Sequence, residues 1–192
     1  MPFIKKLVQF LGVVLMLVVF ALVNQHVRRK YDLDAGWKVQ ADDVTIKIRD
    51  EGNLVTGHNT IGIDEDELVA KGNIPLLPFS LLAQWDYDAK THPPCPDKIM
   101  AFNGKRVKVV GFMYPLQSGE KIKNFCLLRT TQTCCYGPRP QWSQYLLTET
   151  DVPVPFIRFA PVVVTGKFVV DPNPDEGYVY RLDSAVVVVA DQ

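Results

Sequence analysis

The sequence predicts a mainly β protein: a small five-stranded OB-like barrel with one short helix, preceded by an N-terminal transmembrane helix. Three observations support this fold class. An uncharged apolar run occupies residues 7–23, five strand-like segments follow residue 98, and one long irregular connection interrupts those segments. Five short strands with a single long connection are typical of a small OB-type barrel, and an open antiparallel sandwich is the alternative.

Residues 1–30 are predicted to anchor the chain in a membrane. The run at residues 7–23 is apolar on all sides, whereas a helix on a protein core is apolar along one stripe. As a helix it spans ~25 Å, slightly less than the ~30 Å hydrocarbon core of a bilayer. Lys5 and Lys6 precede it as in a signal peptide, but no small-x-small cleavage triplet follows. We therefore expect an uncleaved signal anchor, with a cleaved signal peptide as the alternative.

Charge is distributed unevenly along the chain. Of the 21 basic residues, five lie in residues 1–30, where there is no acidic residue, so the remaining 162 residues hold 16 basic and 21 acidic side chains. A net-acidic body argues against a nucleic-acid-binding protein, because neutralising phosphates requires surplus Lys and Arg. The basic residues on the two sides of the apolar run nearly balance, so the positive-inside rule only weakly favours a body outside the cytoplasm.

Residues 31–74 are predicted to form a polar stalk and a short extended arm. Residues 44–49 alternate apolar and polar side chains like a half-buried strand, and we expect residues 54–56 to return as a hairpin arm. The acidic run at residues 64–67 lacks the glycine and the distal glutamate of a calcium loop, so we interpret it as a solvated helix start. The sequence leaves open whether residues 38–74 pack on the barrel.

The barrel is predicted to occupy residues 75–192. Ser80 is placed to cap a short helix over residues 80–87. Gly166 predicts a bulge or bend inside the fourth strand. Continuous valine runs predict that two strands are buried on both faces or packed against this helix: residues 162–164 and 186–189. The five strands are expected at residues 106–113, 121–129, 141–148, 162–170 and 178–189.

The most unusual motif lies between the second and third predicted strands. It reads Cys134-Cys135-Tyr136-Gly137-Pro138-Arg139-Pro140. Upstream of it lie Asn103-Gly104-Lys105-Arg106-Val107, Gly111-Phe112-Met113-Tyr114-Pro115-Leu116 and Phe125-Cys126-Leu127-Leu128-Arg129. With these segments, roughly residues 76–190 resemble a bacterial family known as domain of unknown function 3299. The resemblance implies a small exported or membrane-attached protein and carries no established activity.

Four interpretations of the cysteines remain open. The first is disulfide bonding among Cys95, Cys126, Cys134 and Cys135; the adjacent pair seldom bonds to itself, because the eight-membered ring is strained. The second is a zinc or cuprous copper site made by Cys134, Cys135, Cys95 and His92. The third is thiol redox chemistry, which is weakened by the absence of a Cys-x-x-Cys motif and of an activating neighbour. The fourth is free, buried cysteine.

The function expected from the sequence is binding or assembly. The chain contains no phosphate loop, nucleophile elbow or zinc-protease motif. We therefore expect a non-enzymatic, single-pass protein of the bacterial inner membrane, with its body in the periplasm or otherwise outside the cytoplasm. It would bind an envelope protein or assist an envelope or transport complex, without a cofactor and without nucleic acid. The alternatives are a metal-binding module for zinc or copper and an envelope thiol-redox protein.

Overall fold

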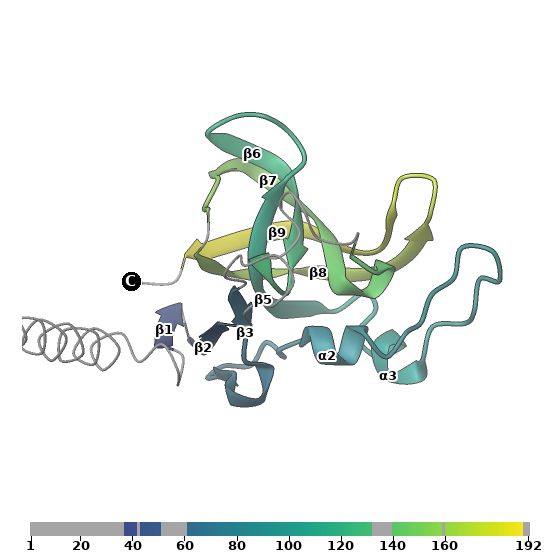
Figure 1. Cartoon of the computed structure of the whole chain (residues 1–192), viewed down its shortest axis with the longest axis horizontal. Coiled ribbons are helices and arrows are strands. Elements are labelled where there is room, and N and C mark those ends of the chain that lie inside the picture. The colour runs from purple at the N-terminus through teal and green to yellow at the C-terminus, as the bar shows by residue number, and fades with distance from the viewer. Residues whose placement is uncertain (1–36, 42, 51–60, 132–139, 159, 190–192) are drawn as a thin grey trace, which may run out of the picture. The chain divides into compact units, whose positions relative to one another are not determined.

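The computed structural model describes residues 37–41, 43–50, 61–131, 140–158 and 160–189. These residues are mainly β, as predicted (Figure 1). No helix among them is long and apolar enough to cross a membrane, and the predicted anchor at residues 7–23 lies outside them. By its internal contacts, Lys38–Gln192 is one compact unit.

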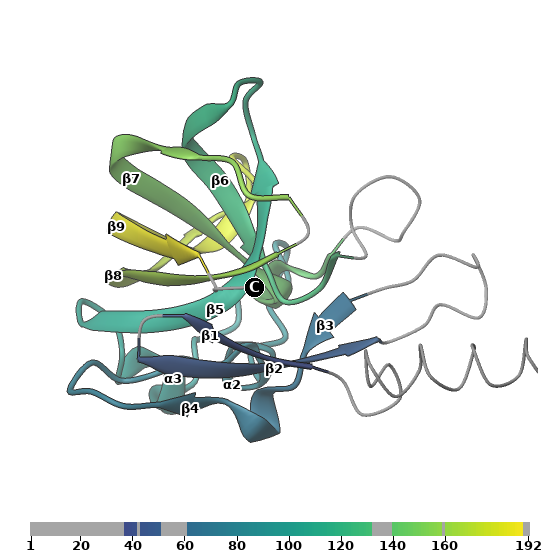
Figure 2. The same ribbon diagram turned by 90° about the vertical axis from the view of Figure 1, so that its left-hand side faces the viewer.

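The five C-terminal strands form a sheet that closes on itself (Figures 1 and 2). They are β5 (Arg106–Pro115), β6 (Lys121–Leu128), β7 (Tyr145–Pro155), β8 (Pro161–Asn173) and β9 (Tyr178–Val189). The order is β5-β6-β7-β9-β8, and β8 returns to pair with β5. All pairs are antiparallel except β7 and β9, which run parallel and share two residue pairs. All five predicted strands are therefore present.

The third strand begins later than predicted. The 3-10 helix η3 (Trp142–Gln144) occupies the beginning of the expected range. Gln141 and Gln144 close this turn reciprocally, because each side chain bonds the backbone of the other residue. Strand β7 then begins at Tyr145 and continues to Pro155, beyond the expected end.

The predicted bulge at Gly166 is confirmed. The register between β8 and β9 shifts between Thr165 and Lys167. A Cβ on Gly166 would lie 3.1 Å from the carbonyl oxygen of Asp183 and 3.3 Å from the Cβ of Ala185. The close approach of β9 at the bulge therefore leaves little room for a side chain at this position.

The two valine runs differ in burial. Residues 162–164 are fully buried, as predicted. The prediction for residues 186–189 is wrong, because Val186 is 52% exposed and Val189 is 41% exposed. Strand β9 pairs with β7 only up to Leu182, so its last residues pair with β8 alone. One face of this valine run is therefore left uncovered.

The hydrophobic core lies inside the closed sheet and extends beneath two short helices, α2 (Phe79–Leu82) and α3 (Asp97–Met100). Its largest fully buried side chains include Tyr180, Phe168 and Phe125. The Tyr180 hydroxyl donates a hydrogen bond of 3.1 Å to the carbonyl oxygen of Leu82. This bond joins β9 to the end of α2, and burial raises the pKa of Tyr180 far above its usual value.

The prediction for the first helix is wrong in its cap and its length. Helix α2 ends at Leu82, and Ser80 lies inside it rather than before it. The Glu65 carboxylate takes over the capping role, because it accepts hydrogen bonds of 2.6 Å from the backbone N–H groups of both Phe79 and Ser80. A distant carboxylate thus satisfies two donors that a helix start otherwise leaves unpaired.

The acidic run at residues 64–67 is also not simply a solvated helix start. Its last three residues form the 3-10 helix η1 (Glu65–Glu67), but Asp64 is buried. The Lys47 ammonium lies 3.6 Å from the Asp64 carboxylate and 2.6 Å from the Glu67 carboxylate. The run therefore has two contacts. Asp64 and Glu67 bind Lys47, and Glu65 caps the start of α2.

Replacing Glu65 with alanine is expected to lower the free energy of unfolding of the full-length chain by about 1–2 kcal/mol, because two capped N–H groups lose their acceptor. Glu67→Ala is the matched control. It removes an ion pair whose carboxylate is 43% exposed, and we expect a change below about 0.5 kcal/mol. Urea unfolding followed by tryptophan fluorescence measures both. Equal losses in the two variants would contradict the capping role.

A second, smaller sheet precedes the closed one. It contains β1 (Trp37–Ala41), β2 (Val44–Asp50), β3 (Ile61–Ile63) and β4 (Val69–Ala70). Strand β2 pairs with the other three, and its apolar side chains at residues 44, 46 and 48 are buried, as the alternation predicted. The predicted return at residues 54–56 lies outside the described residues. The strand that returns in the structure is β3, which the sequence analysis missed.

The small sheet packs on the closed sheet, beside β5 (Figure 2). The Lys108 ammonium of β5 forms an ion pair with the Asp43 carboxylate, and the Lys108 side chain is only 6% exposed. A second contact involves β3. The N–H of Ile61 donates a 3.0 Å hydrogen bond to the hydroxyl of Thr131, which follows β6. Two described segments, residues 43–50 and 61–70, therefore contact the closed sheet through Asp43 and Ile61.

One buried hydroxyl in β7 has no hydrogen-bond partner among the described residues. Thr148 is fully buried and its Oγ1 is unpaired. Thr150 is buried too, but its hydroxyl lies 3.1 Å from the carbonyl oxygen of Lys123 and 2.8 Å from that of Val152. The two threonines therefore provide a matched comparison.

Replacing Thr148 with valine is expected to raise the free energy of unfolding by about 1 kcal/mol, since valine has the same shape without an unpaired hydroxyl. Thr150→Val should instead lower it by about 1 kcal/mol, because a made hydrogen bond is lost. Thermal or urea unfolding of the two variants decides the matter. A loss of stability in Thr148→Val would show that its hydroxyl has a partner in the folded protein.

Candidate functional site

A pocket opens on the outer face of the closed sheet. It has a volume of about 310 Å³ and is lined by residues of β6, β7 and β9 and of the β5–β6 and β8–β9 connections. The lining residues are Leu116, Gln117, Asn124, Leu147, Glu149, Glu176, Tyr178 and Arg181.

Strand register brings these side chains together. Asn124 of β6 lies opposite Glu149 of β7, and Leu147 of β7 lies opposite Arg181 of β9. Residues directly opposite one another share a face of the sheet, and so do residues two apart on one strand. The intervening residue Thr148 points into the core and is fully buried. The outer face of β6, β7 and β9 therefore forms the floor of the pocket.

The charges of the pocket are not balanced. The Arg181 guanidinium is held by two carboxylates: Nη2 and Nε each lie 3.2 Å from oxygens of Asp183, and Nη2 lies 3.8 Å from Asp171. In the part of the chain that the structure describes, neither Glu149 nor Glu176 has an ion pair, and neither carboxylate accepts a hydrogen bond. The charge available to a ligand is therefore negative.

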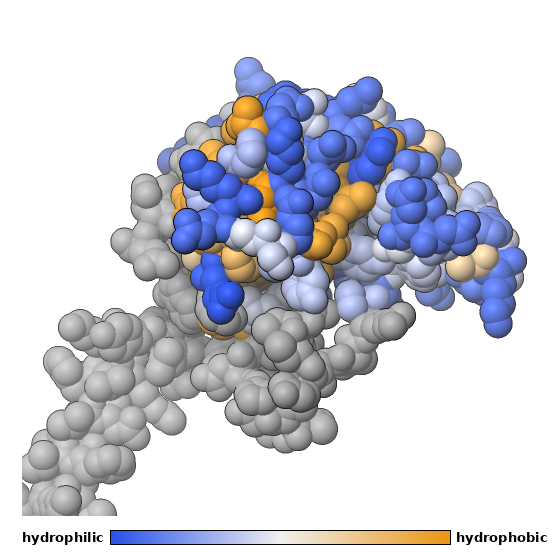
Figure 3. All heavy atoms as spheres, turned by 90° about the horizontal axis from the view of Figure 1, so that it is seen from above, coloured by the Kyte–Doolittle hydropathy of each residue, from blue (hydrophilic) through white to orange (hydrophobic). Residues whose placement is uncertain are grey.

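The surface over this end of the molecule is mixed rather than broadly apolar. Seen from above, hydrophilic side chains dominate and apolar ones are exposed in narrow strips between them (Figure 3). Leu116 is the most exposed apolar residue of the pocket, at 51%. A ligand here would meet apolar contacts next to polar groups, as in most small binding sites.

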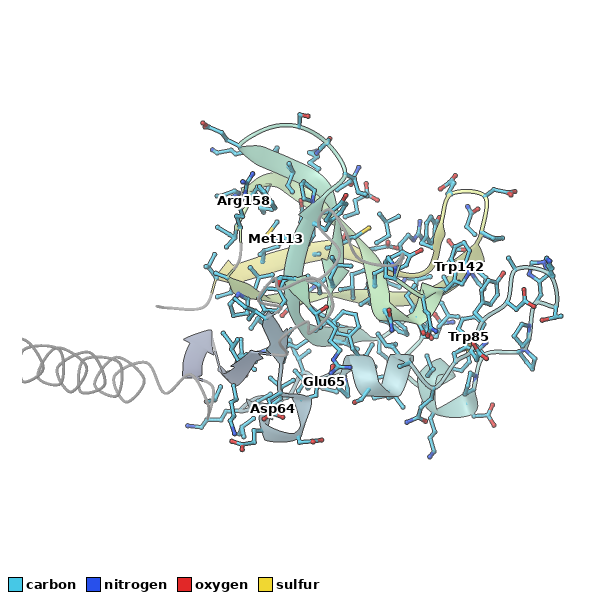
Figure 4. The ribbon with its side chains drawn as sticks, viewed as in Figure 1. Asp64, Glu65, Trp85, Met113, Trp142 and Arg158 are labelled. Carbon is cyan, nitrogen blue, oxygen red and sulfur yellow. The ribbon has the colours of Figure 1, made fainter. Side chains whose placement is uncertain are left out.

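The predicted metal ligands His92 and Cys95 lie elsewhere, beside an aromatic cluster. The Tyr87 hydroxyl and His92 Nδ1 are 2.8 Å apart, and the Tyr87 ring packs edge-on against Trp85 and Trp142, with centroids 5.1 and 5.9 Å away. Figure 4 shows the two tryptophans on the same side of the molecule, close to the helices. His92 is exposed, with a φ of 44°.

Only two of the four predicted metal ligands, His92 and Cys95, are among the described residues. Cys134 and Cys135 lie outside the described residues. Among the residues that are described, no group of three or more His, Cys, Asp or Glu side chains is arranged to hold a metal ion. The metal site therefore stays a prediction.

The two described cysteines form no disulfide with each other. Cys95 packs at the edge of the core, and Cys126 lies on β6 between Tyr114 of β5 and Leu147 of β7. Burial raises the pKa of each thiol to about 11, so neither is a thiolate at neutral pH. Burial, with a contribution from Cys126, also raises the pKa of Tyr145 to about 12. Neither thiol is poised for redox chemistry, and their pairing with the doublet stays a prediction.

The motif loop is described only at its end. Tyr136, Gly137, Pro138 and Arg139 lie outside the described residues, and Pro140 is half-buried just before η3. Its neighbour Trp142 packs against Tyr87, which contacts His92. The first described residues after the doublet, Pro140 to Trp142, therefore lie at the aromatic cluster.

Sequence reasoning missed every residue of the pocket except Leu116, which it quoted only within a motif. Most of the pocket residues are of kinds that are common on any protein surface, so residue type gave no signal. Cysteine is rarer, so the sequence analysis selected the Cys134-Cys135 doublet instead. One signal was present: in an OB-type barrel, the second and third strands and the connections after the first and fourth strands form the binding face. Applied to the five predicted strands, that rule would have selected residues 116–117, 124, 147–149 and 176.

No curated protein matches the chain. A crystal structure of a DUF3299 family protein from Pseudomonas aeruginosa PAO1 is similar, with 21% sequence identity and a TM-score of 0.47, over 63% of this chain and 98% of that chain. The model of the family described as "Protein of unknown function (DUF3299)" matches residues 85–186, which is just over half of the chain and includes the whole pocket. The chain therefore belongs to the DUF3299 family, as its motifs predicted.

Proposed function

We propose that the chain is a membrane-anchored binding protein, with an OB-like barrel outside the cytoplasm that binds a partner protein of the cell envelope. The observation that carries this proposal is the position of the pocket. It lies on the second, third and fifth strands of the closed sheet, between the first and fourth connections. The second and third strands and these two connections form the binding face of OB-type barrels, and here the fifth strand adds Tyr178 and Arg181 to it.

The composition of the pocket supports binding. Its lining combines acidic, amide, phenol, guanidinium and apolar side chains, the mixture of apolar and polar groups that is usual in a binding site. The nearest described thiol, Cys126, is held in its neutral form by burial. A partner protein would supply the remaining contacts around the rim.

The proposal is tested by site-specific photo-crosslinking in intact cells. A photoreactive amino acid at Gln117, in the pocket, is expected to give a discrete adduct with one envelope protein. The matched control is the same substitution at Lys98 of α3, which is exposed but does not line the pocket. Identical adducts at both positions, or none at Gln117, would refute binding through this face.

The location is tested separately. The apolar run at residues 7–23 supports an anchor, and the acidic body is proposed to lie in the periplasm. Protease added to spheroplasts should then digest the body, while a cytoplasmic marker protein stays intact. Protection of the body until the membrane is lysed would place it in the cytoplasm.

A metal-binding module is a second candidate, favoured by the contact between Tyr87 and His92. A metal-binding histidine usually bonds a polar group through its other ring nitrogen, and the Tyr87 hydroxyl is placed to do this at Nδ1. Cys134 and Cys135 would complete the site with Cys95. Elemental analysis of the natively purified full-length chain should then find about one zinc or copper per chain, lost in a Cys134→Ser/Cys135→Ser variant. Equal metal in the variant would exclude the doublet as ligand.

A further inference from the structure

The proposed function leaves open what kind of group enters the pocket. We infer that the pocket accepts the cationic side chain of a lysine or arginine from an extended segment of the partner protein. This inference rests on the proposed function and adds the chemistry of the ligand. It follows from the charge of the pocket and from the apolar side chains that line it.

The first argument is electrostatic. Glu149 and Glu176 both line the pocket, one from β7 and one from the β8–β9 connection, and neither is neutralised by a partner in the described chain. Arg181 is the one basic residue among the lining residues, and Asp183 and Asp171 already hold it. A cation is therefore attracted to the pocket, while an anion meets two free carboxylates and a guanidinium that is already paired.

The second argument is the apolar part of the lining. Leu116 and Leu147 lie on the rim and on the floor, next to Asn124 and Gln117. Lysine and arginine carry an apolar stem and a charged head, so the stem packs on leucine while the head reaches a carboxylate. The amides of Asn124 and Gln117 add acceptors for the remaining N–H groups. A small inorganic cation would use none of the apolar contacts.

The same features disfavour two other ligands of OB-type barrels. Single-stranded nucleic acids bind through a positively charged groove with aromatic side chains that stack on the bases. Tyr178 is the one aromatic residue in this lining, it is buried, and the accessible charge has the wrong sign. Oligosaccharides are neutral, so they would accept the hydrogen-bonding groups of the pocket but would not be attracted by its negative charge. A cationic peptide segment uses both the charge and the apolar contacts.

The test measures peptide binding to the full-length chain in a non-ionic detergent, by fluorescence anisotropy of rhodamine-labelled probes. The probes are tetralysine, tetraglutamate, tetraserine and an oligothymidylate. We expect saturable binding of tetralysine alone, weakened by added salt. The variant Glu149→Gln/Glu176→Gln should weaken it about tenfold.

A matched control separates the pocket from general attraction to an acidic body. Asp151 follows Glu149 on β7 and Asp175 precedes Glu176 in the same connection, and both are exposed without lining the pocket. The variant Asp151→Asn/Asp175→Asn changes the net charge by the same amount and should alter tetralysine binding less than about twofold. An equal loss in both variants would overturn the inference and assign the binding to net charge.

The remaining outcomes distinguish this inference from the proposed function. Preferred binding of tetraglutamate or of the oligothymidylate would overturn the cationic class. Failure of all probes to bind, with a discrete adduct still formed at Gln117, would also overturn it and leave the binding function standing. Failure of the probes together with no adduct would overturn both.

Discussion

Replacing Asp43 with asparagine is expected to lower the free energy of unfolding of the full-length chain by about 3 kcal/mol. The Lys108 side chain, only 6% exposed, forms an ion pair with the Asp43 carboxylate, which is 26% exposed. An asparagine removes the negative charge from this ion pair, and removing one charged partner of a buried pair is strongly destabilising. Urea unfolding of the variant, followed by tryptophan fluorescence, measures the loss.

A second substitution separates the ion pair from the packing around it. Methionine at residue 108 keeps the volume of the lysine stem and removes the charge, so Asp43→Asn/Lys108→Met should lie within about 1 kcal/mol of the wild-type chain. The backbone bonds that Lys108 makes with Pro75 and Leu77 stay in place. A double variant as unstable as Asp43→Asn alone would show that the loss comes from another contact of Asp43.

This ion pair also answers a question that the sequence left open. Residues 38–74 have the composition of either a stalk or a part of the domain, and no local pattern separates the two. The answer depends on Lys108, whose type predicts an exposed residue, and on Asp43, which lies 65 positions away. Burial of a lysine is decided by a distant partner, so periodicity along β5 could not reveal it.

Patterns within one segment predicted the strands, but they did not predict the cap of α2 or the exposed end of β9, which depend on residues far away in the sequence. Alternation at residues 44–49 and the apolar run at residues 162–164 depend on the strand itself, and both are confirmed. The cap of α2 depends on Glu65, 14 positions upstream of Phe79, and Ser80 only satisfies the local rule. The exposed end of β9 follows from the short pairing with β7, which the strand's own sequence does not determine.

The pocket illustrates the same limit for a functional site. Asn124, Glu149 and Arg181 come from three strands, and the register of the closed sheet brings them together. Each of them is an ordinary surface residue in its own strand. The sequence could indicate which face of the sheet to examine, but the charge available there depends on the pairing of Arg181 with Asp183 and Asp171.

The second large effect is expected for Gly111→Ala in β5, which should lower the free energy of unfolding by about 3 kcal/mol. Gly111 pairs with Val162 of β8, and the next residue, Phe112, begins the pairing of β5 with β6. A Cβ at this position would lie 2.7 Å from Leu127 Cγ and 2.8 Å from the carbonyl oxygen of Leu128. A leucine side chain can rotate, whereas this carbonyl belongs to the strand next to β5 and can move only if the strands separate.

Further variants isolate this cause. Because Leu127→Ala itself empties part of the core, the double variant Gly111→Ala/Leu127→Ala is compared with Leu127→Ala alone; Gly111→Ala should still be costly there, because the Leu128 carbonyl remains in the way. Gly104→Ala has no atom within 4 Å of the new Cβ, but its φ of 77° disfavours a side chain, and it should cost only about 1 kcal/mol. Urea unfolding of these variants orders them, and a Gly111→Ala chain as stable as Gly104→Ala would contradict the steric argument. If the order holds, Gly111 is required for the close approach of two strands and serves folding rather than ligand binding.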